Sequence, residues 1–156
     1  MLEDWILRRI EVEKSKSNLN GADLSDAKLM RAKLSDANLR DTDLNGAYFI
    51  AANLTNADLS NADLSRAVLS EANLQGANLS GAMLKEAFLN EANLKGADFE
   101  EADLEDTDLR GADLRQAKNL TCEQIEWAII NKSTQFPDYL EISWTGEDTF
   151  HCNDNC

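Results

Sequence analysis

The chain has 156 residues, a length that allows one domain or a short array of repeats and argues against a two-domain enzyme. Its 29 Asp and Glu against 15 Lys and Arg give a formal net charge of -14, which opposes binding to nucleic-acid phosphates or to an anionic membrane. No run of 18 apolar residues and no signal-peptide pattern is present, so the sequence predicts a cytoplasmic protein without a membrane span.

The first segment has the spacing of an amphipathic helix. Leu2, Trp5, Ile6 and Ile10 recur at helical intervals, and the segment over 11–16, EVEKSK, is polar. The pattern predicts a helix over 2–14 within an N-terminal cap, residues 1–16, that covers the first repeat.

Residues 17–116 repeat every five positions. A Leu or Phe stands at each fifth position from Leu19 to Leu114, twenty times without a slip. Two positions before each stands Ala, with three exceptions at Ser17, Thr42 and Thr107, and the residue between them is mostly Asp or Asn. This A(D/N)LXX period fits neither an amphipathic helix nor an alternating strand, and it predicts a repeat architecture.

The repeat resembles the pentapeptide repeat family, and the resemblance covers about two thirds of the chain. It implies an all-β solenoid, a right-handed quadrilateral β-helix in which the central Leu or Phe and the small residue point inward and four units close one coil. Twenty units imply about five coils, with short α-helical caps at both ends. The predicted core includes Leu24, Leu44, Phe49, Leu64, Leu84, Phe99 and Leu104.

A second helix is predicted after the repeats. Lys118 and Asn119 shift the frame by one residue, and Thr121 with Gln124 has the form of a capping box. Cys122, Ile125, Ala128 and Ile129 then fall on one face, which predicts a helix over 122–131 within a cap over 117–133. In the last segment, 134–156, the alternation of Leu140, Ile142 and Trp144 predicts a short strand, and Gly146–Cys156 is expected to be a polar tail.

Large apolar residues outside the two inward positions gather on one side of the predicted coil. Six such residues occur in the repeats, and counting by twenty places five of them on one side: Met30, Tyr48, Ile50, Val68 and Phe88, with Met83 elsewhere. We call these five residues the apolar stripe. Three alternatives remain for what packs on the stripe: a second copy of the chain, a different protein, or the chain's own tail through Tyr139, Leu140, Ile142, Trp144 and Phe150.

Acidic residues suggest a further hypothesis. Residues 98–108, DFEEADLEDTD, hold seven acids, and some pentapeptide repeat proteins resemble duplex DNA and occupy the DNA site of a topoisomerase. The alternative is a solubilising surface whose regularly spaced Asp and Asn hydrogen-bond the local backbone at the corners. Two outward columns carry these residues: Asp23, Asp43, Asp63 and Asp103, and Asn18, Asn38, Asp58, Asn78 and Asp98.

The cysteines and the single histidine offer a weak metal motif. Cys122, His151, Cys152 and Cys156 match a zinc ligand count, but their spacing lacks a C-x2-C pair. Cys122 is expected to pack on its helix, and Cys152 and Cys156 are expected to be free thiols, or paired with each other in an oxidising compartment.

The sequence therefore predicts a non-catalytic protein. The single histidine lies in the expected tail, and no glycine-rich phosphate loop is present, so we expect no enzyme site, cofactor or small-molecule substrate. The predicted function is a protein-interaction or scaffold module, acting through a protein partner or self-association at the apolar stripe. The alternative is a DNA-mimicking inhibitor of a type II topoisomerase (DNA gyrase). Similar proteins are abundant in cyanobacteria, but the resemblance assigns no specific role.

Overall fold

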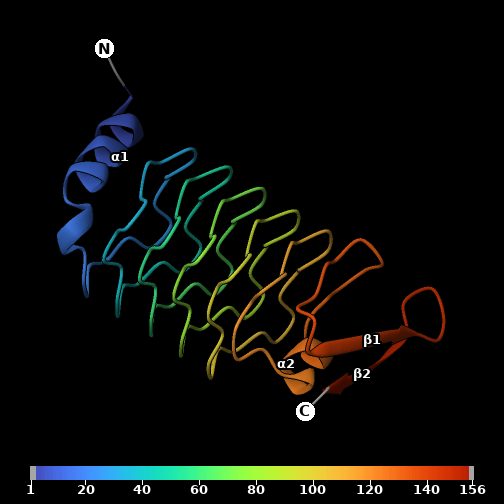
Figure 1. Ribbon diagram of the computed structural model, residues 1–156. Helices are drawn as coiled ribbons and strands as arrows, with labels where there is room; N and C mark the ends of the chain where they lie inside the picture. Colours follow the sequence, from blue (N-terminus) through green and yellow to red (C-terminus); the bar gives the residue numbers. More distant parts are fainter. Residues whose placement is uncertain (1–2, 155–156) are drawn as a thin grey trace.

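Each five-residue unit makes one straight side of a coil, and the next coil lies directly beside it. The N–H of Leu24 donates to the carbonyl of Asp43 at 2.8 Å, and the N–H of Asp43 donates to the carbonyl of Ala22 at 3.0 Å. The same parallel bridging recurs along the repeats between residues twenty apart, as in Asp43 with Asp63. The computed structural model describes residues 3–154 and shows these coils stacked between a helix at each end (Figure 1).

Corners between the sides use a left-handed backbone conformation. The residue two after each central Leu or Phe has a positive φ, 54° at Asp26 and 66° at Gly46, and this holds at every fifth position from Gly21 to Gln116. The N–H of Ala27 closes the turn onto the carbonyl of Leu24 at 3.1 Å, as in a type II turn. Glycine recurs at this position because it adopts a positive φ without strain.

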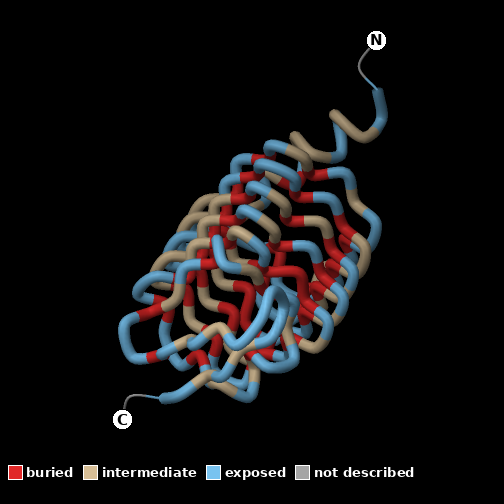
Figure 2. The backbone as a smooth tube through the Cα atoms, turned by 90° about the vertical axis from the view of Figure 1, so that its right-hand side faces the viewer, coloured by how far each residue is buried: buried red, intermediate tan, exposed pale blue. Residues whose placement is uncertain are grey.

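The interior is filled by the two inward residues of each unit. All seven core residues predicted from the sequence are at most 3% exposed, and most of the inward Ala are fully buried (Figure 2). Thr42 and Thr107 replace Ala and remain buried because their hydroxyls donate to the carbonyls of Leu19 and Leu84, at 3.1 and 2.7 Å. The small and large columns therefore interlock as a close-packed core.

Helix α1 (Asp4–Lys14) covers the first coil through polar side chains as well as apolar ones. Arg9 Nη1 donates to the carbonyl of Met30 at 3.0 Å, and the N–H of Lys33 donates to Glu13 Oε1 at 3.0 Å. These bonds satisfy backbone groups that have no preceding coil to pair with. The buried residue of α1 is Val12, from the segment expected to be polar, whereas Trp5, Ile6 and Ile10 are half-buried. Leu2 lies outside the described residues.

Helix α2 (Cys122–Trp127) is shorter than predicted. Its capping box is present, with Thr121 accepting from the N–H of Gln124 and the Gln124 side chain accepting from the N–H of Thr121. The predicted extension to residue 131 is wrong because Ile129 instead pairs with Asp108 in a parallel bridge and is 46% exposed. The chain thus resumes the coil pattern after one short helix.

The last segment forms a hairpin beyond α2 (Figure 1). Strand β1 (Leu140–Trp144) is confirmed, but the expected polar tail contains a second strand, β2 (Phe150–Asp154), which pairs antiparallel with β1. Phe150 and Cys152 alternate with exposed residues, so β2 has one apolar face that packs with β1 against the end of the core. We call residues 140–154 the C-terminal hairpin.

Tyr139 joins the C-terminal hairpin to the coils. Its hydroxyl donates to the carbonyl of Ala117 and accepts from the N–H of Leu120, both at 3.0 Å. Burial raises the pKa of this phenol above its usual value. Next to it, Leu140 is buried at 6% exposure.

Candidate functional site

The apolar stripe lies along one side of the coils, as counting by twenty predicts. Parallel bridges join Tyr48 to Val68 and Val68 to Phe88, so these three residues form a column with neighbours one strand spacing apart, about 4.8 Å. Met83 belongs to a different column, paired with Asp63.

The C-terminal hairpin does not cover the stripe. Tyr48, Ile50 and Phe88 are 41%, 39% and 47% exposed, whereas Met30 and Val68 are half-buried. Of the three alternatives, coverage by the chain's own tail is therefore wrong, because the hairpin packs on the C-terminal end of the stack instead. The stripe is therefore exposed to solvent, and the apolar residues of the tail pack on the C-terminal end of the stack instead of on it.

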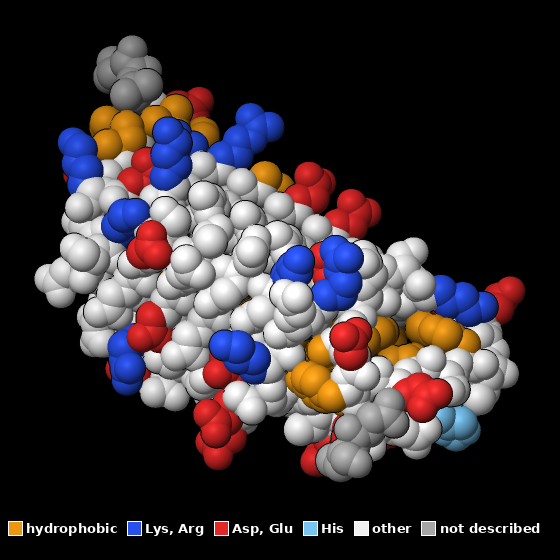
Figure 3. Space-filling model, viewed as in Figure 1, with side chains coloured by type: hydrophobic (Ala, Val, Ile, Leu, Met, Phe, Trp, Pro, Cys, Tyr) orange, Lys and Arg blue, Asp and Glu red, His pale blue; other side chains and the backbone are white. Residues whose placement is uncertain are grey.

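Helix α1 extends the stripe at its N-terminal end. Trp5, Lys28, Met30, Tyr48 and Ile50 line a cavity of about 290 Å³ whose wall is apolar. The sequence assigned Trp5 only to capping, because nothing in the helical spacing shows that its ring reaches this side of the coil. Figure 3 shows one face of the molecule, on which apolar side chains gather over α1 and around the C-terminal hairpin, with charged side chains between them.

The outward Asp and Asn columns make local hydrogen bonds. Asp23 Oδ1 accepts from the N–H of Ser25 at 3.1 Å, and Asp58 Oδ1 accepts from the N–H of Ser60 at 3.1 Å. The same bond recurs at Asn38, Asp43, Asp63, Asn78, Asp98 and Asp103. Asn18 lies apart from this pattern, in the short 3₁₀ turn Lys16–Asn18. Corner geometry accounts for these residues, so their spacing does not favour DNA mimicry.

A bidentate ion pair follows Phe88 in the stripe's column, between Phe88 and Ile129. Arg110 Nε and Nη2 lie 2.9 and 2.7 Å from the two carboxylate oxygens of Asp108, which is 5% exposed. The hydrogen bond from Arg110 lowers the pKa of Asp108 below its usual value, against the burial that would raise it.

We expect the Asp108 pair to contribute to acid stability. Because the folded pKa is lowered, its contribution is present above the unfolded pKa, about 3.9, and is lost as pH falls through the folded value. Arg110→Gln should raise the pKa of Asp108 toward its usual value, and its stability deficit should vanish at low pH. Carboxyl NMR titration checks this, with Arg115→Gln as the matched control at the neighbouring Asp113 pair; an unmoved Asp108 pKa in Arg110→Gln would contradict it.

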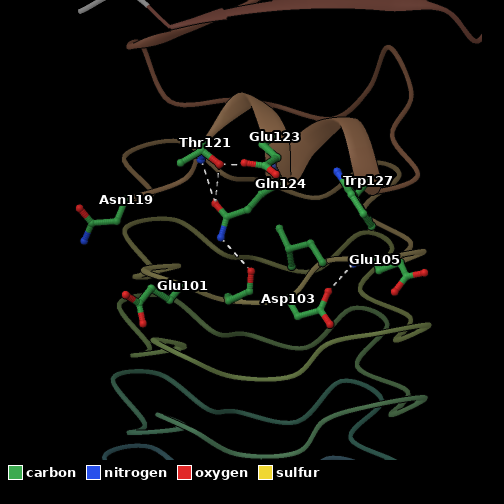
Figure 4. Close-up of a pocket in the computed structure, with 10 residues that line it drawn as sticks. Glu101, Asp103, Glu105, Asn119, Thr121, Glu123, Gln124 and Trp127 are labelled. Atoms are coloured by element: carbon green, nitrogen blue, oxygen red, sulfur yellow. Dashed lines mark hydrogen bonds between the residues drawn. The ribbon is translucent and has the colours of Figure 1, made fainter.

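A second hollow lies where α2 meets the last repeats (Figure 4). It has a volume of about 430 Å³, and its lining includes Glu101, Asp103, Glu123 and Trp127. Gln124 fixes α2 above it by donating through Nε2 to the carbonyls of Phe99 and Ala102, at 2.8 and 2.9 Å. The acidic run predicted from the sequence includes Glu101 and Asp103 but not Glu123, and Trp127, which is 56% exposed, had no predicted role. The break in the five-residue period at Lys118 and Asn119 was the sequence signal for this hollow, because it ends the repeats and places α2 over this side of the last coil.

The cysteines differ from expectation. Cys122 packs against the core as expected, but it also forms a disulfide with Cys152, with their Cα atoms 5.4 Å apart. The expectation that Cys152 is free or paired with Cys156 is therefore wrong. The spacing of the cysteines does not indicate this pairing. It arises because β2 runs antiparallel to β1 and thereby brings Cys152 to Cys122, the first residue of α2. Cys156 lies outside the described residues.

The same disulfide takes up two of the four candidate ligands of the weak metal motif, Cys122 and Cys152. A carboxylate oxygen of Asp154 lies within 4.8 Å of both sulfurs, but these sulfurs are bonded to each other. His151 is exposed and its strand position places it on the opposite face of β2 from Cys152. Within residues 3–154, no helix is long and apolar enough to cross a membrane.

Comparisons with known proteins agree on the repeat. Residues 15–46, 47–85 and 77–116 match the family described as "Pentapeptide repeats (8 copies)". A pentapeptide repeat protein from the thylakoid lumen of Arabidopsis thaliana is 29% identical with a TM-score of 0.60, over 63% of this chain and 70% of that one. HetL, a pentapeptide repeat protein involved in heterocyst differentiation regulation in Nostoc, is 28% identical with a TM-score of 0.44, over 87% and 80%.

A further structure, a pentapeptide repeat protein from Nostoc, is 30% identical over 87% of this chain and 88% of that one, with a TM-score of 0.34. No curated protein matches the sequence. The likeness to the Arabidopsis protein identifies the fold as a right-handed quadrilateral β-helix. Because the family match spans well over half of the residues, the chain belongs to the pentapeptide repeat family.

Proposed function

We propose that this chain is a non-catalytic module that binds another protein through the apolar stripe. The observation that supports this function is the exposure of Tyr48, Ile50 and Phe88 on a side that the chain's own tail leaves open. Contiguous exposed apolar residues on a soluble protein commonly mark an interaction site. Pentapeptide repeat proteins are generally non-catalytic, and apart from the phenol of Tyr48 the stripe residues carry no ionisable side chain.

The partner's chemistry follows from the shape of the stripe. Tyr48, Val68 and Phe88 stand in a straight row on a rigid stack, with the Trp5 cavity at one end and the Asp108–Arg110 pair at the other. Aromatic residues are enriched among the residues that dominate binding energy, and rigid positioning lowers the entropy cost of binding. We therefore propose an apolar ridge of a different protein as the occupant, with a second copy of this chain as the competing outcome.

The test compares the double variant Tyr48→Ser/Phe88→Ser with Met83→Ser. Met83 is 46% exposed and stands in the same repeat position on another side, so it is the matched control. Loss of a hot-spot side chain costs about 2 kcal/mol or more, so two such losses, if they add, should weaken a stripe complex on the order of 10³-fold. Partner binding is measured by affinity capture from the native extract followed by titration with the purified partner, and mass by light scattering.

The outcomes of this experiment distinguish binding of a different protein, self-association and DNA mimicry. Loss of a partner in the double variant but not in Met83→Ser supports the proposal. A fall in mass from dimer to monomer shows that the stripe joins two copies. Unchanged mass and unchanged partners would overturn both uses of the stripe, and salt-sensitive inhibition of DNA gyrase by the double variant would then favour DNA mimicry.

A further inference from the structure

The disulfide joins two elements that are held to the coils in different ways. It connects Cys122, the first residue of α2, with Cys152 in the middle of β2, across 30 positions of sequence. The repeats from 17 to 116 contain no cysteine, so this bond acts only at the C-terminal end.

Helix α2 is fixed without the disulfide. Ile125 is fully buried, and Gln124 both completes the capping box and bonds to the carbonyls of Phe99 and Ala102. Trp127 adds a backbone bond, because its carbonyl accepts from the N–H of Asp106 at 2.9 Å. Breaking the disulfide should therefore leave α2 in place.

The C-terminal hairpin is fixed less firmly. It is a two-stranded sheet, a structure that is marginally stable alone in water. Leu140 is its buried anchor, whereas Ile142, Trp144 and Phe150 are half-buried and the rest of β2 is mostly exposed. On β2, the covalent link through Cys152 is therefore the strongest attachment to the body of the protein.

The disulfide is reachable by small molecules and lies beside a negative charge. Both cysteines are half-buried rather than enclosed. The carboxylate of Asp154 lies within 4.8 Å of both sulfurs, on the same face of β2 as Cys152. An approaching thiolate meets this charge, so an anionic thiol is repelled more than a neutral or cationic one.

We propose that the Cys122–Cys152 disulfide is a thiol-exchange site that works as a latch on the C-terminal hairpin and takes neutral or cationic thiols in preference to anionic ones. A thiolate RS⁻ attacks one sulfur, breaks the S–S bond and forms a mixed disulfide, and the other cysteine leaves as a thiolate that takes up a proton. A second RS⁻ then releases the first cysteine, so two RSH are oxidised to RSSR and two protein thiols form. Reduction frees the hairpin while α2 and the coils stay folded.

The first test follows hydrogen exchange of the full chain in a Cys156→Ser background, oxidised and after reduction by a phosphine. Backbone amides of β1 and β2 should exchange at least 10-fold faster after reduction, and amides of the repeats should change less than 2-fold. A Cys122→Ser/Cys152→Ser/Cys156→Ser variant should match the reduced state with or without phosphine. Equal protection of the hairpin in both states would overturn the latch, and so would loss of protection throughout the repeats.

The second test measures how fast cysteamine and 3-mercaptopropionate cleave the disulfide, at a fixed thiolate concentration and low salt. Each rate is divided by the rate of the same thiolate with an uncharged small disulfide, because intrinsic nucleophilicity differs between the two thiolates. On this scale cysteamine should react at least 5-fold faster, and Asp154→Asn should reduce this ratio at least 2-fold. Glu141→Gln is the matched control because Glu141 lies on the opposite face of the C-terminal hairpin and should leave the ratio unchanged. An equal ratio in wild type and Asp154→Asn would overturn the charge selectivity. Neither test involves the apolar stripe, so failure here is distinguishable from failure of the proposed binding function.

Discussion

Replacing Leu64 by Asp is expected to unfold the coil stack. Leu64 is fully buried between the equivalent residues Leu44 and Leu84 of the neighbouring coils, and an Asp there would put a carboxylate among aliphatic side chains without a partner. Burying an unpaired charge, together with losing the Leu contacts, costs free energy comparable with the whole stability of a domain, about 5–15 kcal/mol.

Circular dichroism and urea titration check this first expectation. Asn56→Asp is the matched control, since it adds the same charge at an exposed corner and should change the free energy of unfolding by less than about 0.5 kcal/mol. Leu64→Ala should be intermediate, at about 2–5 kcal/mol. A folded and cooperative Leu64→Asp protein would show that the interior tolerates water, contrary to its close packing.

Enlarging an inward alanine is expected to have the second largest effect. Ala77 is fully buried and stands two residues before the buried Leu79, so Ala77→Leu would place extra carbon atoms where the neighbouring coils leave no room. Overpacking of a dense core typically costs about 1–3 kcal/mol, and in a regular stack the strain passes to the coils on both sides. We expect a loss of about 3 kcal/mol in the free energy of unfolding, measured by urea titration.

Ala22→Leu provides the comparison for Ala77→Leu. Ala22 occupies the same repeat position but borders a cavity of about 210 Å³ between α1 and the first coil, lined also by Val12 and Leu19. The larger side chain can enter this space, so the free energy of unfolding should change by less than about 1 kcal/mol or rise. Equal losses in the free energy of unfolding for Ala22→Leu and Ala77→Leu would contradict this expectation, because they would show that the space beside Ala22 does not relieve the overpacking.

The repeats could be predicted from the sequence because each residue's environment recurs every five and every twenty positions. The inward setting of Phe49 and the common column of Tyr48 and Phe88 follow from counting alone, and the structure places them there. The sequence could not explain why Thr42 replaces Ala at an inward position. The structure does, because the Thr42 hydroxyl donates to the carbonyl of Leu19 in the neighbouring coil.

The ends could not be predicted to the same degree because no period constrains them. Val12 is the buried residue of α1 although its neighbours are charged, and its place depends on how the helix crosses the first coil. Ile129 leaves the helical pattern because pairing with Asp108 continues the backbone ladder. The Cys122–Cys152 bond depends on a hairpin whose second strand carries too few apolar residues to be recognised as one.

The parallel bridges between residues twenty apart also bear on how the chain folds. Apart from the local turn bonds, the parallel bridges between repeat residues each span about 0.13 of the chain length, so forming one coil requires closing a loop of the same modest size as forming the next. Folding can therefore begin on any adjacent pair of coils and extend in both directions, with a rate that changes little as coils are added. The two ends depend on the coils in turn, because α1 and the C-terminal hairpin can dock only where a coil has already formed.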